Sequence, residues 1–181
     1  CLPIVEALLA AGSEKQPARQ PLLVIGDNTR VGGDDSWLEA APAARGLHIR
    51  YRLDYGLGHV IGRQSIELSL SPAVFHKELA AARTFITQEE AEWLQSQGLA
   101  KRATSQDLLV FDASGPVDNT LRFPNECVRH KALDLVGDLA LIGCDFAGRV
   151  AAYRSGHRLN AEMARALLAE GRLLTDRRRT A

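Results

Sequence analysis

Short apolar runs separated by polar turns cover most of this chain, and the spacing of the apolar positions predicts both strands and helices. Residues from His48 to Asp54 alternate between apolar and polar side chains, as expected of a strand with one buried face. Strands are expected at 22–25, 36–40, 47–53, 65–70, 108–111 and 148–153. Helices are expected at 2–12, 72–82, 87–97, 126–138 and 161–168.

Capping residues support three of these helices. Ser71 precedes a proline and suits a helix start, because its side chain can accept a hydrogen bond from the first turn. Thr87 and Glu90 form a capping box before a helix that stops at Gly98. Asn160 is expected to cap the last helix from outside its first turn.

Two glycine-containing segments carry histidines. The segment 56–62 lacks the G-x-G-x-x-G spacing of a phosphate-binding loop, and we interpret it as a flexible connection with His59 as a surface residue. The alternative, that it lines a ligand, stays open. A turn at Gly156 would present His157 at the end of the preceding strand. The pattern is equally consistent with a solvated histidine that has no role and with a catalytic one.

The helix at 126–138 carries an unusual polar stripe. At roughly 100° per residue, His130, Asp134 and Asp138 fall within about 80° of one another. An imidazole and a carboxylate one turn apart can bind a single cation, and the third group can support them. A buried ion pair in a structural helix is the alternative. Because burying three ionisable groups without a role is unfavourable, we favour half of a metal site.

Composition limits the classes of partner. The 181 residues contain 22 Lys and Arg and 22 Asp and Glu, so no net positive charge attracts nucleic acid. The three cysteines lack C-x-x-C spacing, which suits a reducing compartment, and we expect Cys127 to be a small buried thiol. No apolar run approaches the ~20 residues of a transmembrane segment, so we expect a cytoplasmic protein.

The ends of the chain suggest a fragment. An apolar helix at 2–12 begins without an initiator Met and is followed by a polar, proline-containing linker at 13–21. Arg177, Arg178 and Arg179 are expected to be a solvated tail. The expected divisions are a helix remnant of another domain with its linker at 1–15, a domain at 16–175 and a basic tail at 176–181.

Three blocks of residues resemble a known family. They are Ala82-Arg83-Thr84-Phe85, then Val128 to Asp134 with Gly137-Asp138-Leu139, and then Tyr153-Arg154-Ser155-Gly156-His157-Arg158-Leu159-Asn160. In type, order and separation they are similar to the zinc-dependent UDP-3-O-acyl-N-acetylglucosamine deacetylases, which act in lipid A biosynthesis in Gram-negative bacteria. The resemblance runs from about Leu22 to Leu168.

The resemblance implies an α+β fold in which a mixed β-sheet packs against helices in two layers. It also implies that this is the second of two similar domains, with the active site between them. The family's first domain supplies a Glu-His pair, a general base and a third zinc ligand. Glu6-Ala7 does not match that pair, because alanine cannot bind metal, so the missing first domain is an expected partner.

The same resemblance implies roles for five residues. His130 and Asp134 would be two protein ligands of Zn²⁺. Thr84 would stabilise the oxyanion of the tetrahedral intermediate. His157, oriented by Asp138, would be the acid that protonates the leaving amine.

The substrate implied is a UDP-linked, acylated amino sugar. Lys131 would point off the ligand stripe and bind the sugar or phosphate end. Phe85 and the segment 87–110 would line the channel for the acyl chain, with Ala91 and Ala100 shaping it.

Two further hypotheses stay open. One is a non-catalytic binding or scaffold domain of the same fold, with a degenerate metal site. The other is a nucleic-acid-binding module, which the neutral charge disfavours. If the deacetylase hypothesis holds, this chain alone should be inactive and should bind zinc weakly, because the Glu-His pair is missing.

Overall fold

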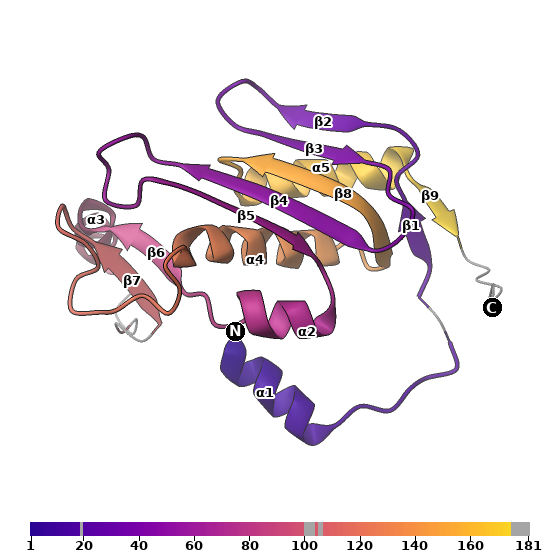
Figure 1. Cartoon of the computed structure of the whole chain (residues 1–181), viewed down its shortest axis with the longest axis horizontal. Coiled ribbons are helices and arrows are strands. Elements are labelled where there is room, and N and C mark those ends of the chain that lie inside the picture. The colour runs from indigo at the N-terminus through magenta and orange to yellow at the C-terminus, as the bar shows by residue number, and fades with distance from the viewer. Residues whose placement is uncertain (19, 100–103, 105–106, 175–181) are drawn as a thin grey trace.

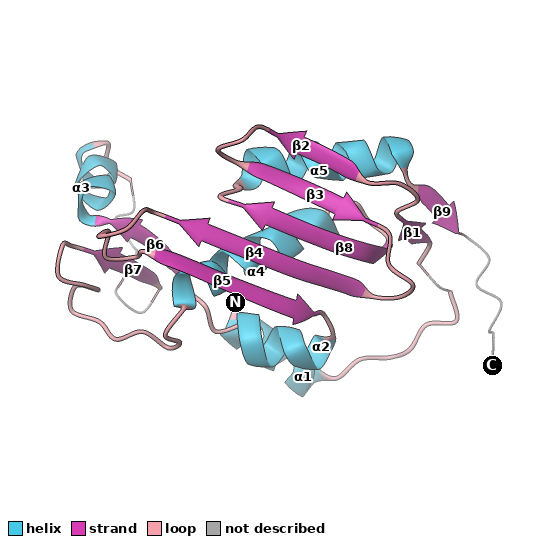
Figure 2. Cartoon of the chain, turned by 45° about the horizontal axis from the view of Figure 1, so that its top comes forward, coloured by secondary structure: helices cyan, strands magenta, loops and turns pink. Residues whose placement is uncertain are grey.

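The computed structural model of the chain describes residues 1–18, 20–99, 104 and 107–174. These residues form a mixed β-sheet with helices packed on one of its faces, and Figure 1 shows this arrangement in two layers. The other face of the sheet is turned toward the viewer in Figure 2. The expected α+β class and two-layer packing are therefore confirmed.

Strand β8 (Asp145–Tyr153) organises the main sheet, because three strands pair with it. Strand β4 (Leu47–Asp54) runs parallel to it along one side. On the other side, β3 (Trp37–Ala41) pairs antiparallel with its later residues and β1 (Leu22–Val24) pairs parallel with its first residues. Three more strands extend the sheet from β3, β4 and β1: β2 (Thr29–Gly32), β5 (Arg63–Ser69) and β9 (Arg172–Leu174).

Two long helices cover one face of this sheet and form the core with it. Helix α4 (Glu126–Ala140) packs on β4 and β5, and helix α5 (His157–Glu170) packs on β2 and β3. Within β4, Ile49, Tyr51 and Leu53 are buried, and the residues between them are exposed. The predicted alternation is confirmed. Buried side chains of the helices complete the core: Val128, Ala132 and Leu135 from α4, and Leu159, Met163 and Leu167 from α5.

A smaller unit lies beside the main sheet. Strands β6 (Thr84–Thr87) and β7 (Leu108–Phe111) pair in parallel, and helix α3 (Gln88–Ser96) follows β6 directly. The predicted capping box is present: the Thr87 hydroxyl accepts from the Glu90 amide at 3.3 Å, and the Glu90 carboxylate accepts from the Thr87 amide at 2.8 Å. Ala100 lies outside the described residues.

The helix expected at 72–82 is shorter than predicted, and most of it is not α-helical. Ser71 caps its first turn as expected, with its hydroxyl accepting from the Val74 amide at 3.2 Å. The three residues of α2 (Pro72–Val74) continue as a π-helical turn, η1 (Phe75–Leu79). The chain then turns into β6, so Thr84 and Phe85 lie on a strand rather than after a helix end.

The start of the last helix was predicted wrongly. Helix α5 begins at His157 with Gly156 as its N-cap residue, and Asn160 lies inside its first turn. Asn160 is 1% exposed and bonds to other side chains instead of to the helix start. His157 is therefore fixed at a helix N-terminus and is not part of a loop.

Four further features complete the description of the fold. Helix α1 (Leu2–Ala11) forms as predicted and ends at Gly12, with no buried residue. The short strands β2 and β9 were not predicted. Among the described residues no helix is long and apolar enough to cross a membrane. The tail at 177–179 lies outside them, and the divisions at 1–15, 16–175 and 176–181 remain predictions.

Candidate functional site

A cleft of about 810 Å³ lies where β4 and β8 end, between strand β6 and the helices α4 and α5. Six residues selected from the sequence line it: Thr84, Phe85, His130, Lys131, Asp134 and His157. The seventh, Asp138, is not among the residues that line the cleft. It lies one turn after Asp134 on α4 and contacts His157. The fold thus gathers residues from three distant parts of the sequence in one cavity.

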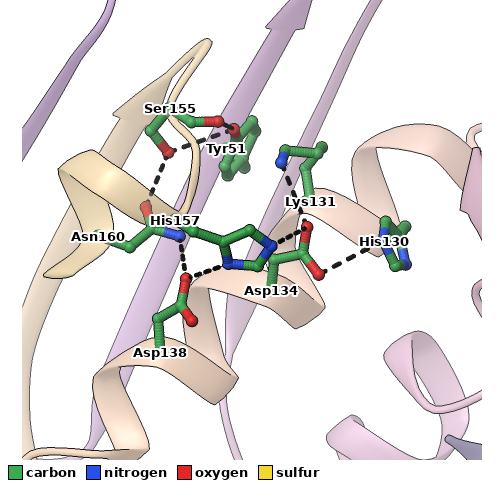
Figure 3. A network of polar contacts seen from close by, with 8 residues as sticks. All are labelled: Tyr51, His130, Lys131, Asp134, Asp138, Ser155, His157 and Asn160. Carbon is green, nitrogen blue, oxygen red and sulfur yellow. Dashed lines mark hydrogen bonds and ion pairs between the residues drawn. The ribbon is translucent and has the colours of Figure 1, made fainter. Parts of the chain in front are cut away.

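The Asp134 carboxylate is the centre of the polar contacts in this cleft (Figure 3). His130 Nε2 lies 3.3 Å from Asp134 Oδ1. On the other oxygen, Oδ2, Lys131 Nζ lies at 3.2 Å and His157 Nε2 at 4.0 Å. The predicted i, i+4 pairing of His130 with Asp134 is therefore present, and His157 from α5 approaches the same carboxylate.

His130 is held in a form suited to binding a metal. Its side chain is mostly buried and packs edge-on against Phe85, with ring centroids 6.1 Å apart. Burial lowers the pKa of His130 below its usual range, although the Asp134 carboxylate opposes this shift. The buried Nδ1 atom makes no hydrogen bond of ordinary geometry to a described residue, although the Ala82 backbone lies close enough to oppose the lowering of the pKa. A metal ion binds a ring nitrogen that carries no proton, so a lowered pKa favours metal binding by His130.

The distance between His130 and Asp134 fits two ligands of one zinc ion. Ligands at about 2.0–2.1 Å from a tetrahedral zinc are roughly 3.3 Å apart, close to the 3.3 Å between Nε2 and Oδ1. No group of three His, Cys, Asp or Glu side chains within the described part of the chain could hold a metal. Cys127 does not extend the set, because it is 1% exposed and burial raises the pKa of its thiol to about 12. It is the buried thiol that the sequence predicts.

His157 occupies the edge of the cleft and is anchored from one side. Its Nδ1 lies 2.8 Å from Asp138 Oδ2, while the side chain remains 71% exposed. An ionised carboxylate only accepts hydrogen bonds, so Nδ1 carries the proton in this contact. The second ring nitrogen, Nε2, then faces Asp134 and the cleft. The contact between Asp138 and His157 that the resemblance implies is therefore present.

Thr84 and Phe85 are positioned by a buried ion pair at the start of α4. Arg83 is 7% exposed and Glu126 is fully buried, and Arg83 Nε donates to Glu126 Oε1 at 2.8 Å. Burial alone would raise the pKa of Glu126, but hydrogen bonds from Arg83 and from the Arg122 amide hold that pKa below its usual range. Strand β6 therefore leaves this anchor with the exposed Thr84 and the buried Phe85 directed to the cleft.

Two outcomes differ from the expectations for the substrate side. Lys131 does not point away from the ligand stripe, because its flexible side chain folds back onto Asp134. Arg154, which the sequence analysis did not select, lines the same cleft with a backbone φ of +49°. A positive φ at a non-glycine residue was a signal that the sequence could not supply.

The segments proposed to line an acyl channel are only partly in the cleft. Phe85 and Glu90 line it, whereas Ala91 lines a second cavity of about 400 Å³ between α3 and β7, which shares Ile86 with the cleft. The segment 56–62 contributes Gly56 to the main cleft, so the alternative that it lines a ligand site is kept. His59 is half-buried and stacks on Tyr55, with ring centroids 4.8 Å apart.

Comparison with known proteins points to one family. Residues 1–169 match the family model described as UDP-3-O-acyl N-acetylglycosamine deacetylase. A UDP-3-O-acyl-N-acetylglucosamine deacetylase of Glaesserella parasuis is 36% identical over 169 residues, which are 92% of this chain and 55% of that protein. The protein of the same name from Brucella ovis is 39% identical over 168 residues, which are 92% of this chain and 58% of that protein. The chain thus spans a little over half the length of these curated relatives.

Proposed function

The chain belongs to the UDP-3-O-acyl N-acetylglycosamine deacetylase family, and on this premise we propose that it forms part of a zinc-dependent amide hydrolase. The proposed reaction removes the N-acetyl group of UDP-3-O-acyl-N-acetylglucosamine and releases acetate, in lipid A biosynthesis. The observation that carries this proposal is that His130 and His157, from two different helices, approach the Asp134 carboxylate in one cleft.

His130 Nε2 and Asp134 Oδ1 would hold the zinc ion. When bound, zinc supplies Lewis-acid chemistry that polarises the acetyl carbonyl and makes water acidic enough to attack at neutral pH. We propose that the third ligand and the general base come from a first domain, which together with this chain would build the cleft. The 55–58% coverage of the relatives leaves room for such a domain.

His157 would protonate the leaving amine. In amide hydrolysis, water adds its oxygen to the acetyl carbon, the C–N bond breaks, and the sugar nitrogen must gain a proton before it leaves. His157 Nε2 faces the cleft with Nδ1 held by Asp138, so the proton can be delivered from a ring of fixed orientation. Asp138 would stabilise the cationic ring until it gives its proton to the amine.

Thr84, Lys131 and Phe85 would act on the rest of the substrate. The exposed Thr84 lines the cleft and would donate its hydroxyl hydrogen to the oxyanion. Lys131 would exchange its contact with Asp134 for one with the sugar or a phosphate oxygen. Phe85 already covers His130 with its ring and would exclude water on the side of the acyl group.

The second candidate is a binding or scaffold domain with a degenerate metal site. It is favoured by one observation, that no third ligand stands near His130 and Asp134 in the described part of the chain. The two candidates differ in what happens when a first domain is supplied, because only the deacetylase should then gain activity.

Release of acetate from the sugar nucleotide tests the proposal. The 181-residue chain alone should be inactive. The two-domain protein, meaning this chain joined to the first domain that supplies the Glu-His pair, should release acetate. In the two-domain protein, Asp134→Asn should abolish activity, whereas Glu162→Ala, at an exposed ion pair on α5, should not change it. A two-domain protein that contains the Glu-His pair and zinc but releases no acetate would favour the scaffold candidate.

A further inference from the structure

A chain of buried polar side chains leads from the centre of the sheet to the site. It begins at Tyr51 on β4, passes through Ser155 and Asn160, and ends on the Asp138 carboxylate (Figure 3). Tyr51 is 0%, Ser155 4% and Asn160 1% exposed. Nothing in the sequence pattern selected these three residues as functional, and Asn160 was expected to be a helix cap.

The direction of each hydrogen bond in this chain follows from the chemistry of its ends. Asp138 Oδ2 can only accept, so Asn160 Nδ2 donates to it at 2.8 Å and Asn160 Oδ1 points the other way. The Ser155 hydroxyl then donates to Asn160 Oδ1 at 3.1 Å. The Tyr51 hydroxyl donates to the Ser155 carbonyl at 2.5 Å and lies 3.2 Å from the Ser155 Oγ. The Asn160 amide is therefore fixed from both ends.

An asparagine at this position needs a reason. Its neighbours on the buried side of α5, Leu159 and Met163, are apolar core residues. Burying a carboxamide among them is unfavourable unless its polar atoms are paired. Asparagine is also a poorer helix former than the aliphatic residues that would fit a core position. Both disadvantages are offset by the contacts with Ser155 and Asp138.

Asn160 and His157 donate to the same carboxylate oxygen. Each lies 2.8 Å from Asp138 Oδ2, one from inside the core and one from the cleft. His157 is 71% exposed, and among its described contacts only Asp138 and the more distant Asp134 fix the ring. The mostly exposed ring is thus connected through one oxygen to a rigid, buried amide.

We propose that Asn160, supported by Ser155 and Tyr51, is a positioning residue that fixes the Asp138 carboxylate and thereby the His157 ring. This inference rests on the proposed function, in which His157 protonates the leaving amine. Without Asn160 the Asp138 side chain can rotate about its own bonds, and the ring bonded to it follows. A ring held in several orientations delivers a proton less often along the required line.

Kinetics of the two-domain protein test this role. Asn160→Ala should lower kcat by about 10–100-fold, the usual effect of losing a residue that orients a catalytic group, and should leave KM nearly unchanged. Met163→Ala is the matched control, since it removes a fully buried side chain one turn further along α5 and outside the chain of hydrogen bonds. Met163→Ala should destabilise the protein. At temperatures where this variant is still folded, its kcat should equal that of the wild type.

A double-mutant cycle separates positioning from general damage. If Asn160 acts only through His157, then Asn160→Ala should lower kcat no further in a His157→Ala background. Fully additive losses would overturn the proposal. If Asn160→Ala does not fold, Ser155→Ala takes its place in the same cycle, with a smaller loss expected in the same direction.

A spectroscopic test does not depend on activity. In the 181-residue chain with ¹⁵N-labelled histidine, the His157 Nδ1 resonance should be that of a protonated, hydrogen-bonded nitrogen. At the same pH, Asn160→Ala should move both ring nitrogens toward the averaged shifts of free imidazole, and Met163→Ala should not. Identical spectra for the wild type and Asn160→Ala would overturn the inference. A two-domain protein that releases no acetate would instead overturn the proposed function and leave the spectroscopic result to decide the positioning.

Discussion

Helix α4 carries two groups of charged residues that differ in how completely their charges are paired. At its start, the buried Glu126 accepts hydrogen bonds from the Arg83 side chain and from the Arg83 and Arg122 amides. The Arg83 guanidinium also donates to the Asn119 side chain and the Thr120 carbonyl. The Arg83 guanidinium therefore donates at least four hydrogen bonds inside the protein, and the group is almost closed to solvent, since Arg83 is 7% and Glu126 0% exposed.

Further along α4, around Asp134, the second group is open, meaning that it is less completely paired. Asp134 is approached by His130, Lys131 and His157, yet the contact distances are 3.2–4.0 Å, and His157 is largely exposed. On the far side of the His130 ring, the buried Nδ1 makes no hydrogen bond of ordinary geometry to a described residue. The same helix thus carries one charge cluster that is satisfied by the fold and one that retains capacity for a further ligand.

This difference separates stability from function. A fully hydrogen-bonded buried pair strongly penalises the loss of either partner, because the other charge is then buried alone. A partly satisfied cluster contributes less to folding and is typical of sites where a metal or substrate completes the contacts. We therefore expect substitutions in the first cluster to change stability and substitutions in the second to change catalysis.

After the loss of Asp134 itself, the largest effect on kcat is expected from His157→Ala in the two-domain protein. Loss of a general acid should lower kcat by ~10²–10⁴-fold, with little change in KM, because the proton is transferred in the transition state. The free energy of unfolding should change by less than about 0.5 kcal/mol, since the side chain is 71% exposed. A change in KM alone would make His157 a binding residue. It would then no longer support the view that the first cluster serves stability and the second serves catalysis.

Glu126→Ala should have the largest effect on stability. It leaves the buried Arg83 without its carboxylate and should lower the free energy of unfolding by about 3–5 kcal/mol. Urea denaturation of the 181-residue chain measures this loss. Glu162→Ala is the control, because its exposed pair with Arg158 spans 3.7 Å and should contribute less than about 1 kcal/mol. An equal loss of unfolding free energy in the two variants would show that the buried Arg83–Glu126 pair contributes no more to stability than an exposed pair.

Lys131→Ala tests the substrate side of the open cluster. Losing one charged contact with a phosphate or sugar oxygen should raise KM by roughly tenfold, the equivalent of about 1.4 kcal/mol, with a smaller change in kcat. Steady-state kinetics of the two-domain protein give both constants. A fall in kcat at constant KM would place Lys131 in the chemical step and not in binding.

A smaller effect should appear in the acid stability of the chain. Because the folded pKa of Glu126 lies below its ordinary value of about 4.3, its stabilisation is fully present above that pH and is lost as pH falls through the folded pKa. Glu126→Gln should remove this part of the pH dependence. Urea denaturation between neutral pH and pH 3 measures it, and a parallel pH dependence in both proteins would count against the pairing.

Sequence reasoning succeeded where the signal was local. The stripe of His130, Asp134 and Asp138 follows from helical geometry alone, and the Thr87 capping box is a pattern of four residues. The placement of His157 beside Asp138 was expected only from the family resemblance, because the two residues are 19 positions apart.

It failed where distant contacts override local preference. Asn160 has the form of a helix cap, but its amide is used by Asp138, 22 residues earlier, and by Ser155. The Arg83–Glu126 pair joins residues 43 positions apart and was not foreseen. The end of the 72–82 helix was misplaced for a related reason, since β6 must start at Thr84 to pair with Leu108.

Zinc binding measured by equilibrium dialysis tests most directly the claim that the open cluster is part of a metal site. We expect the 181-residue chain, which offers His130 and Asp134 as ligands, to bind zinc weakly, and the two-domain protein to hold one zinc ion tightly. His130→Ala should abolish the tight binding in the two-domain protein. One tightly held zinc ion in the 181-residue chain, or tight binding that survives His130→Ala, would contradict the account.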